Sequence, residues 1–74
     1  MTSLVKDFPL FPLEKILKMA GKEVGVDRVS KTAVLELKRI LLERAEEIAT
    51  RAVLFAKHAK RVTVKGEDIK LAIR

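Results

Sequence analysis

The sequence predicts an all-α protein in which one long central helix lies between two short ones. Residues 31–59 contain neither proline nor glycine, and apolar residues recur through them at steps of three and four. That spacing matches the period of about 3.6 residues that is typical of an amphipathic helix. Shorter segments of the same periodicity lie on either side, each set off by proline or glycine. These observations define three helices joined by two short loops.

Residues 1–8 are expected to form a short flexible segment ahead of a single domain, 9–74. The first helix is expected to begin at Pro12 and to run through Ala20, because proline suits the first helical position. Its apolar face comprises Leu13, Ile16, Leu17 and Ala20. Gly21 either weakens this helix or marks the close approach of another backbone, and Gly25 is expected to end it.

The central helix is expected to run from Lys31 to Ala59, with Ser30 as its N-cap. At 1.5 Å per residue it is about 43 Å long, which is more than a single small globule can cover. A second copy of the chain is therefore expected to cover its apolar stripe, as a homodimer. The residues expected in the dimer core are Leu37, Leu41, Ile48 and Ala52.

A short extended loop, 60–65, is expected after the central helix, because β-branched residues alternate there. The last helix opens at Gly66, with Glu67 and Asp68 favourably placed in its first turn. Its expected buried face comprises Ile69, Ala72 and Ile73.

The composition favours an oligomer with a polyanionic partner. The chain has 74 residues and no cysteine, so it can form neither disulfides nor thiolate metal sites. With one histidine, a zinc site of ordinary ligands is not expected, and neither is a cofactor. Chains this small usually need such supports or oligomerisation. The net charge of +6 favours a polyanionic partner, with nucleic acid first and an acidic membrane second. The alternative is that the composition is that of a thermally robust helical protein rich in Lys and Glu.

The sequence does not predict a membrane protein or a secreted one. No run approaches the roughly 18 apolar residues that a membrane-spanning helix needs. Met1–Asp7 lacks the apolar core of a signal peptide. The protein is therefore expected in the cytoplasm, associated with the chromosome if its partner is DNA.

The basic residues gather at the two ends of the central helix, whereas charges of both signs interleave along its middle. Arg28 and Lys31 flank its N-terminal end. Four more basic residues lie at or just after its C-terminal end, namely Lys57, Lys60, Arg61 and Lys65. Antiparallel pairing of two chains would join these groups into a composite patch at each end of the dimer. Such a patch, with helix N-termini near Ser30 and Gly66, would hold a duplex by its phosphates. No basic helix suited to reading bases is present, and the three phenylalanines are expected in the core.

Five segments resemble the archaeal (prokaryotic) histones, and the likeness covers nearly everything after Lys6. They are PLFPLEKILKMAG at 9–21, RVS at 28–30, AKHA at 56–59, RVTVK at 61–65 and, most specifically, EDIKLAIR at 67–74. The resemblance implies a histone fold, a handshake homodimer, and binding and compaction of double-stranded DNA without strong sequence preference.

Position by position, the resemblance also implies roles for individual residues. Arg61 and Asp68 match a buried pair that braces the second loop. Thr63 and Lys65 match phosphate contacts, Arg28 matches an arginine directed at the minor groove, and Lys15 matches a basic position facing DNA. His58, Phe55 and Asp68 match an interface between dimers. Set against these roles, His58 could simply favour the helix dipole, Arg61–Asp68 could be a surface pair, and Lys57 and Lys60 could be solvated lysines.

Three departures from the family pattern bear on assembly. The segment between Gly21 and Ser30 is longer than usual by about four residues. Lys60 stands where a glycine often ends the long helix, and Val62 stands where a lysine often contacts phosphate. These differences favour a closed tetramer or a bridging mode over continuous wrapping into long fibres.

A different class of function stays open from the sequence, namely a histone-fold subunit of a transcription or other complex that needs a heterologous partner. An enzyme is not expected, and neither is a small-molecule substrate. The sequence offers no nucleophile beside a base, no phosphate-binding glycine loop and no metal cluster, and Asp68 is better explained by Arg61.

Overall fold

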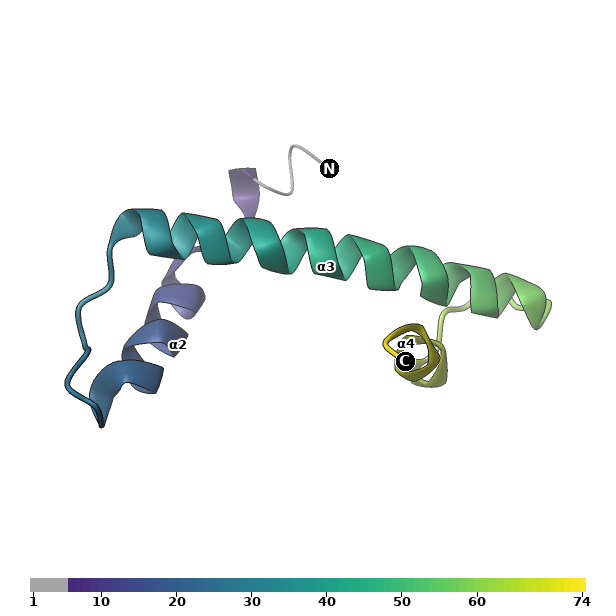
Figure 1. Cartoon of the computed structure of the whole chain (residues 1–74). Coiled ribbons are helices and arrows are strands. Elements are labelled where there is room, and N and C mark those ends of the chain that lie inside the picture. The colour runs from purple at the N-terminus through teal and green to yellow at the C-terminus, as the bar shows by residue number, and fades with distance from the viewer. Residues whose placement is uncertain (1–5) are drawn as a thin grey trace. The chain divides into compact units, whose positions relative to one another are not determined.

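The computed structural model describes residues 6–74, and three helices lie wholly within that range, in the predicted order. They are α2 (Phe11–Lys22), α3 (Lys31–His58) and α4 (Gly66–Ala72), as Figure 1 shows. No strand occurs within residues 6–74, so the predicted all-α class is confirmed. Of the predicted flexible segment, residues 1–5 lie outside the described part, and Lys6 and Asp7 are helical.

The packing contacts divide the chain into two compact units, Met1–Leu42 and Glu43–Arg74, which are described separately below. The first unit contains α2, the loop that follows it and the first part of α3. The second contains the rest of α3, the loop 59–65 and α4.

Helix α2 begins one residue before the predicted start and continues two residues past the predicted end. Its C-terminus closes with the paired hydrogen bonds of a Schellman motif. The amide of Val26 donates to the carbonyl of Gly21 at 2.9 Å, and the amide of Gly25 donates to that of Lys22 at 3.4 Å. Gly25 has φ +78°, which confirms that it ends the helix. The close approach at Gly21 is also confirmed, because a Cβ there would lie 1.7 Å from the carbonyl oxygen of Val26.

Helix α3 begins where the Ser30 cap predicts. The amide of Ala33 donates to Ser30 Oγ at 3.1 Å, which satisfies one of the unpaired donors of the first turn. The helix ends at His58, one residue before the predicted end, and it closes with the same Schellman motif as α2. Arg61 N donates to Ala56 O at 3.0 Å, and Lys60 N donates to Lys57 O at 2.9 Å. Helices α2 and α3 therefore end with the same arrangement of backbone hydrogen bonds.

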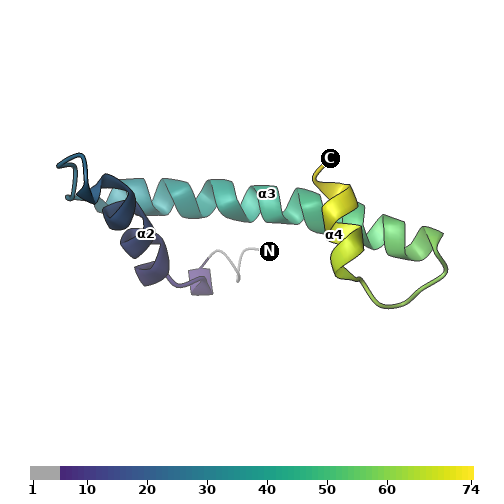
Figure 2. The same ribbon diagram turned by 90° about the horizontal axis from the view of Figure 1, so that it is seen from below.

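In the second unit α4 crosses alongside the C-terminal half of α3, as the two views agree (Figures 1 and 2). Ala52 and Ala56 on α3 are buried, as is Ala72 on α4. Such small side chains allow two helix backbones to approach closely. Arg51 Nη1 donates to the carbonyl oxygen of Ala72 at 3.2 Å and so satisfies a terminal acceptor of α4.

Much apolar surface remains uncovered in the single chain. Phe11, which was expected in the core, is 72% exposed, and Ile69 and Ile73 are also exposed although the sequence predicted a buried face. The other large apolar residues left exposed include Ile16, Met19, Leu35, Ile40, Leu41, Val53, Leu54 and Leu71. An apolar surface this extensive is characteristic of an interaction site rather than of an isolated monomer.

The four residues predicted for the dimer core differ in how much surface they still offer. Leu41 is exposed, and Leu37 and Ile48 are half-buried. Ala52 is 0% exposed, so it is already covered within its own chain and has no surface left for a partner.

The polar side of α3 carries ion pairs three residues apart, Glu36 with Arg39 and Arg44 with Glu47. Their side chains are about half exposed, so each pair adds little to stability. Lys38 belongs to the stretch of mixed charge along the middle of α3, yet it is only 6% exposed. A lysine can be covered in this way because its four-carbon stem is apolar.

Candidate nucleic-acid interface

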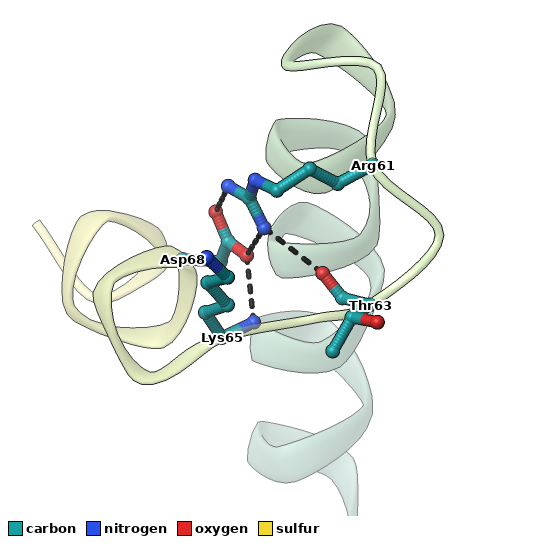
Figure 3. Close-up of polar contacts among 4 residues, drawn as sticks. All are labelled: Arg61, Thr63, Lys65 and Asp68. Atoms are coloured by element: carbon teal, nitrogen blue, oxygen red, sulfur yellow. Dashed lines mark hydrogen bonds and ion pairs between the residues drawn. The ribbon is translucent and has the colours of Figure 1, made fainter.

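The second loop, residues 59–65, is held by one arginine and one aspartate. Arg61 Nη2 donates to Asp68 Oδ1 at 2.8 Å, and Arg61 Nη1 donates to Asp68 Oδ2 at 2.9 Å, in the bidentate geometry that Figure 3 shows. Arg61 Nη1 also donates to the carbonyl oxygen of Thr63 at 2.9 Å. One guanidinium therefore ties the middle of the loop to the first turn of α4.

Asp68 is 2% exposed, and it closes the loop from the other side. Its Oδ2 accepts a hydrogen bond from the amide of Lys65 at 2.8 Å, just ahead of the first turn of α4. The hydrogen bond from Arg61, helped by the one from the Lys65 backbone, lowers the pKa of Asp68 to about 2, so the carboxylate stays ionised at neutral pH. The same bond raises the pKa of Arg61. Both groups are thus charged, paired and fixed in position.

This arrangement presents two side chains to solvent from a backbone that is held by hydrogen bonds. Thr63 and Lys65 are exposed, while the carbonyl of Thr63 and the amide of Lys65 are held by the pair. Figure 3 shows the carbonyl and the amide turned toward the pair from the loop between α3 and α4. A hydroxyl and an ammonium presented in this way suit phosphate oxygens, which supply most of the contacts that proteins make with a nucleic-acid duplex.

Two open hollows adjoin this loop in the second unit. We call the first the basic hollow, and its lining residues are Leu54, Phe55, Lys57, His58 and Lys60. The second is lined by Phe55, His58, Ala59, Arg61, Glu67, Asp68 and Leu71. The structure therefore brings together Phe55, His58 and Asp68, the three residues predicted for contacts between dimers, around one hollow.

The first unit presents its basic residues around the loop 23–30. Arg28 is exposed and lines an open hollow with apolar residues of α2 and of the loop. Lys31 is the first residue of α3 and is exposed, and Lys15 is exposed on α2. Here the hydrogen bonds of the Schellman motif and of the Ser30 cap hold the backbone on either side of Arg28, and its charge is available to a partner.

Sequence reasoning missed three features of the structure. The hydrogen bond from Arg51 to the end of α4 joins residues 21 positions apart, and no local sequence pattern predicts it. The burial of Lys38 was not predicted, because charged side chains are usually exposed. Lys60 has a left-handed backbone, with φ +59°, and the only signal was that it occupies a position where glycine is usual.

Within residues 6–74, no group of three or more His, Cys, Asp or Glu side chains is placed to hold a metal ion. None of the helices in this described part is long and apolar enough to cross a bilayer.

Comparison with known proteins gives a consistent result. The core histone domain matches residues 1–74. An archaeal histone of Thermococcus zilligii, a subunit of HAN1, is 40% identical over 68 residues, covering 92% of this chain and 96% of that protein. The probable archaeal histone 3 of Methanocaldococcus jannaschii is 47% identical over 68 residues, with the same two coverages.

Proposed function

The chain belongs to the histone family, and from that premise we propose that it is an architectural protein that binds and compacts double-stranded DNA without strong sequence preference. The observation that carries this proposal is the second loop, in which the Arg61–Asp68 pair holds the backbone while Thr63 and Lys65 stay exposed. The net charge of +6 suits a polyanion. Contacts of this kind fix a duplex by its backbone, so they carry little sequence information.

The binding unit in this proposal is a homodimer. The apolar residues left exposed on all three helices support it, because a second copy with the same exposed surface is the simplest complement. In an antiparallel handshake, the Arg28 loop of one chain would lie beside the second loop of its partner. Leu37, Leu41 and Ile48 retain surface that such a partner could cover, whereas Ala52 does not.

The proposed DNA contacts extend beyond the second loop. They are Lys15, Arg28, Lys31, Lys60, Thr63 and Lys65. The proposed contact between dimers is the hollow that Phe55, His58 and Asp68 line. Dimers joined there would form a closed tetramer or bridge two duplexes. We favour these assemblies over continuous wrapping because the first loop, residues 23–30, is longer than is usual in the family.

Binding that depends on phosphates should respond strongly to salt. We expect the logarithm of the affinity for duplex DNA to fall linearly with the logarithm of salt concentration, with a slope of several units, and to be nearly equal for unrelated sequences. Fluorescence anisotropy with two unrelated labelled duplexes over a range of salt would measure both. Salt-insensitive binding, or no binding to duplex DNA, would contradict the proposal.

Arg28→Ala and Lys65→Ala should each reduce the magnitude of the salt slope by about one unit for every chain bound, because each removes one cation that displaces a counterion from the duplex. Arg44→Ala is the matched control, since Arg44 is paired with Glu47 on the mixed face of α3 and has no proposed contact. It removes the same formal charge. Equal reductions in all three variants would mean that the affinity follows net charge rather than these positions.

A heterologous partner is the second candidate, and the word "subunit" in the name of the T. zilligii relative favours it. A homodimer should sediment as a folded species of two chains when the protein is purified alone. An aggregated or poorly folded chain that becomes soluble only when a second histone-fold protein is co-expressed would favour this candidate instead.

A further inference from the structure

Lys60 has a backbone conformation that its side chain disfavours. Its φ is +59°, and no other residue except glycine has a positive φ within residues 6–74. In this left-handed region the Cβ of an L-residue crowds its neighbouring backbone, whereas glycine has no Cβ. The equivalent position of the Schellman motif that ends α2 is occupied by Gly25, with φ +78°. The same turn is thus built once with glycine and once with lysine.

The turn itself does not require a lysine at this position. Lys60 contributes to it through its amide, which donates to the carbonyl of Lys57, and glycine has the same amide. Asn and Asp are better suited to a left-handed backbone, because their short side chains can bond locally. Within residues 6–74 the salt bridges found do not include Lys60. Folding alone therefore gives no reason for the ammonium at this position.

The surroundings of Lys60 do give a reason. It lines the basic hollow together with Lys57, His58 and the apolar residues Leu54 and Phe55, and no acidic side chain lines that hollow. The next cation along the chain, Arg61, is paired with Asp68. Val62 is fully exposed and uncharged, so Lys60 is the last ammonium before Lys65. Strain retained at a residue that the fold does not need points to a function of its side chain.

We propose that the chain sacrifices folding stability at Lys60 in order to hold its ammonium against a phosphate of DNA at the end of α3. This inference rests on the proposed function, which already counts Lys60 among the DNA contacts, and adds that this contact is made from a strained backbone at the expense of folding stability. Lys60 would extend the phosphate contacts of Thr63 and Lys65 back to the end of α3, on the side of the loop where Val62 offers no charge.

Three variants separate the charge from the strain. Lys60→Gln removes the charge and keeps the strain, so it should leave the folding equilibrium constant within about twofold. It should reduce the salt slope of DNA binding by about one unit for each bound chain. Lys60→Gly should reduce the slope equally and raise the folding equilibrium constant about two- to fivefold, the relief of strain being partly offset by the flexibility of glycine in the unfolded chain. Arg44→Gln is the control for net charge.

Chemical denaturation at fixed protein concentration and anisotropy over a range of salt would measure the two quantities. A wild-type slope of several units that Lys60→Gln leaves unchanged would overturn the inference while the proposed function stands. Equal slope losses in Lys60→Gln and Arg44→Gln would also overturn it, because only net charge would then matter. A Lys60→Gly variant no more stable than wild type would refute the strain, and a wild type without salt-dependent DNA binding would refute the proposed function itself.

Discussion

Arg61→Ala is expected to lower the melting temperature by about 10 °C or more at neutral pH. Asp68 is 2% exposed in the wild-type protein, and the substitution removes both guanidinium donors to its carboxylate and leaves the amide of Lys65 as the donor. An uncompensated buried charge is among the most destabilising changes a small domain can undergo. The side chain of Arg61 is itself 25% exposed, so water would relieve part of the loss. Thermal unfolding followed by circular dichroism, at one fixed protein concentration, would measure the shift.

Two further variants test the geometry of the pair. Arg61→Lys keeps the charge but cannot make the bidentate contact, so its melting temperature should lie between those of wild type and Arg61→Ala. In the double variant Arg61→Ala with Asp68→Ala, the buried charge is gone, and the loss should be smaller than the sum of the single losses. A melting temperature of Arg61→Ala within about 2 °C of wild type would mean that the pair is a solvated surface contact.

The same pair should make stability depend on pH in the acid range. The pKa of Asp68 falls from 3.8 to about 2 on folding, so the folded state holds the proton more weakly than the unfolded state. The stabilisation is therefore fully present above about pH 4 and is lost as the pH falls toward 2. Asp68→Asn should lack this component, and its melting temperature should fall less steeply than that of wild type between pH 5 and about 2. Parallel curves would contradict the assignment to Asp68.

The helices could be predicted from the sequence because the signals that set them are local. The period of apolar residues, the Ser30 cap and the glycine that ends α2 each act within a few residues of one another. The sequence could not predict which apolar residues are buried within the single chain and which remain exposed. Ala52 and Leu41 lie on the same stripe, yet one is buried within its own chain and the other is exposed.

The candidate site likewise combines residues that the sequence identified with features that it could not predict. Arg61 and Asp68 are seven residues apart on either side of a short loop, and the resemblance to histones marked both. The strain at Lys60 was not predictable, because the sequence shows only that glycine is missing and not whether the backbone keeps its left-handed turn. The contact from Arg51 to the end of α4 depends on how two helices cross. Periodicity does not determine that crossing.

Gly21→Ala is expected to destabilise the protein by about 2 kcal/mol, although alanine is the better helix former. The added Cβ would lie 1.7 Å from the carbonyl oxygen of Val26, and this atom belongs to the backbone rather than to the end of a flexible side chain. The loop must therefore move away, and the hydrogen bond from Val26 to Gly21 must lengthen or break. This cost exceeds the gain of about 1 kcal/mol in helix propensity.

The other two glycines separate this clash from the general effects of the substitution. A Cβ at Gly66 would meet nothing within 4 Å, so Gly66→Ala should be neutral or slightly stabilising. A Cβ at Gly25 also has space, but its φ of +78° is left-handed, so Gly25→Ala should cost about 1 kcal/mol through strain alone. Denaturant unfolding should therefore rank the losses as Gly21, Gly25, Gly66, and a Gly21→Ala variant as stable as Gly66→Ala would contradict the close approach. Because Arg28 lies two residues beyond Val26, Gly21→Ala should also weaken DNA binding, whereas Gly66→Ala leaves the first loop unchanged.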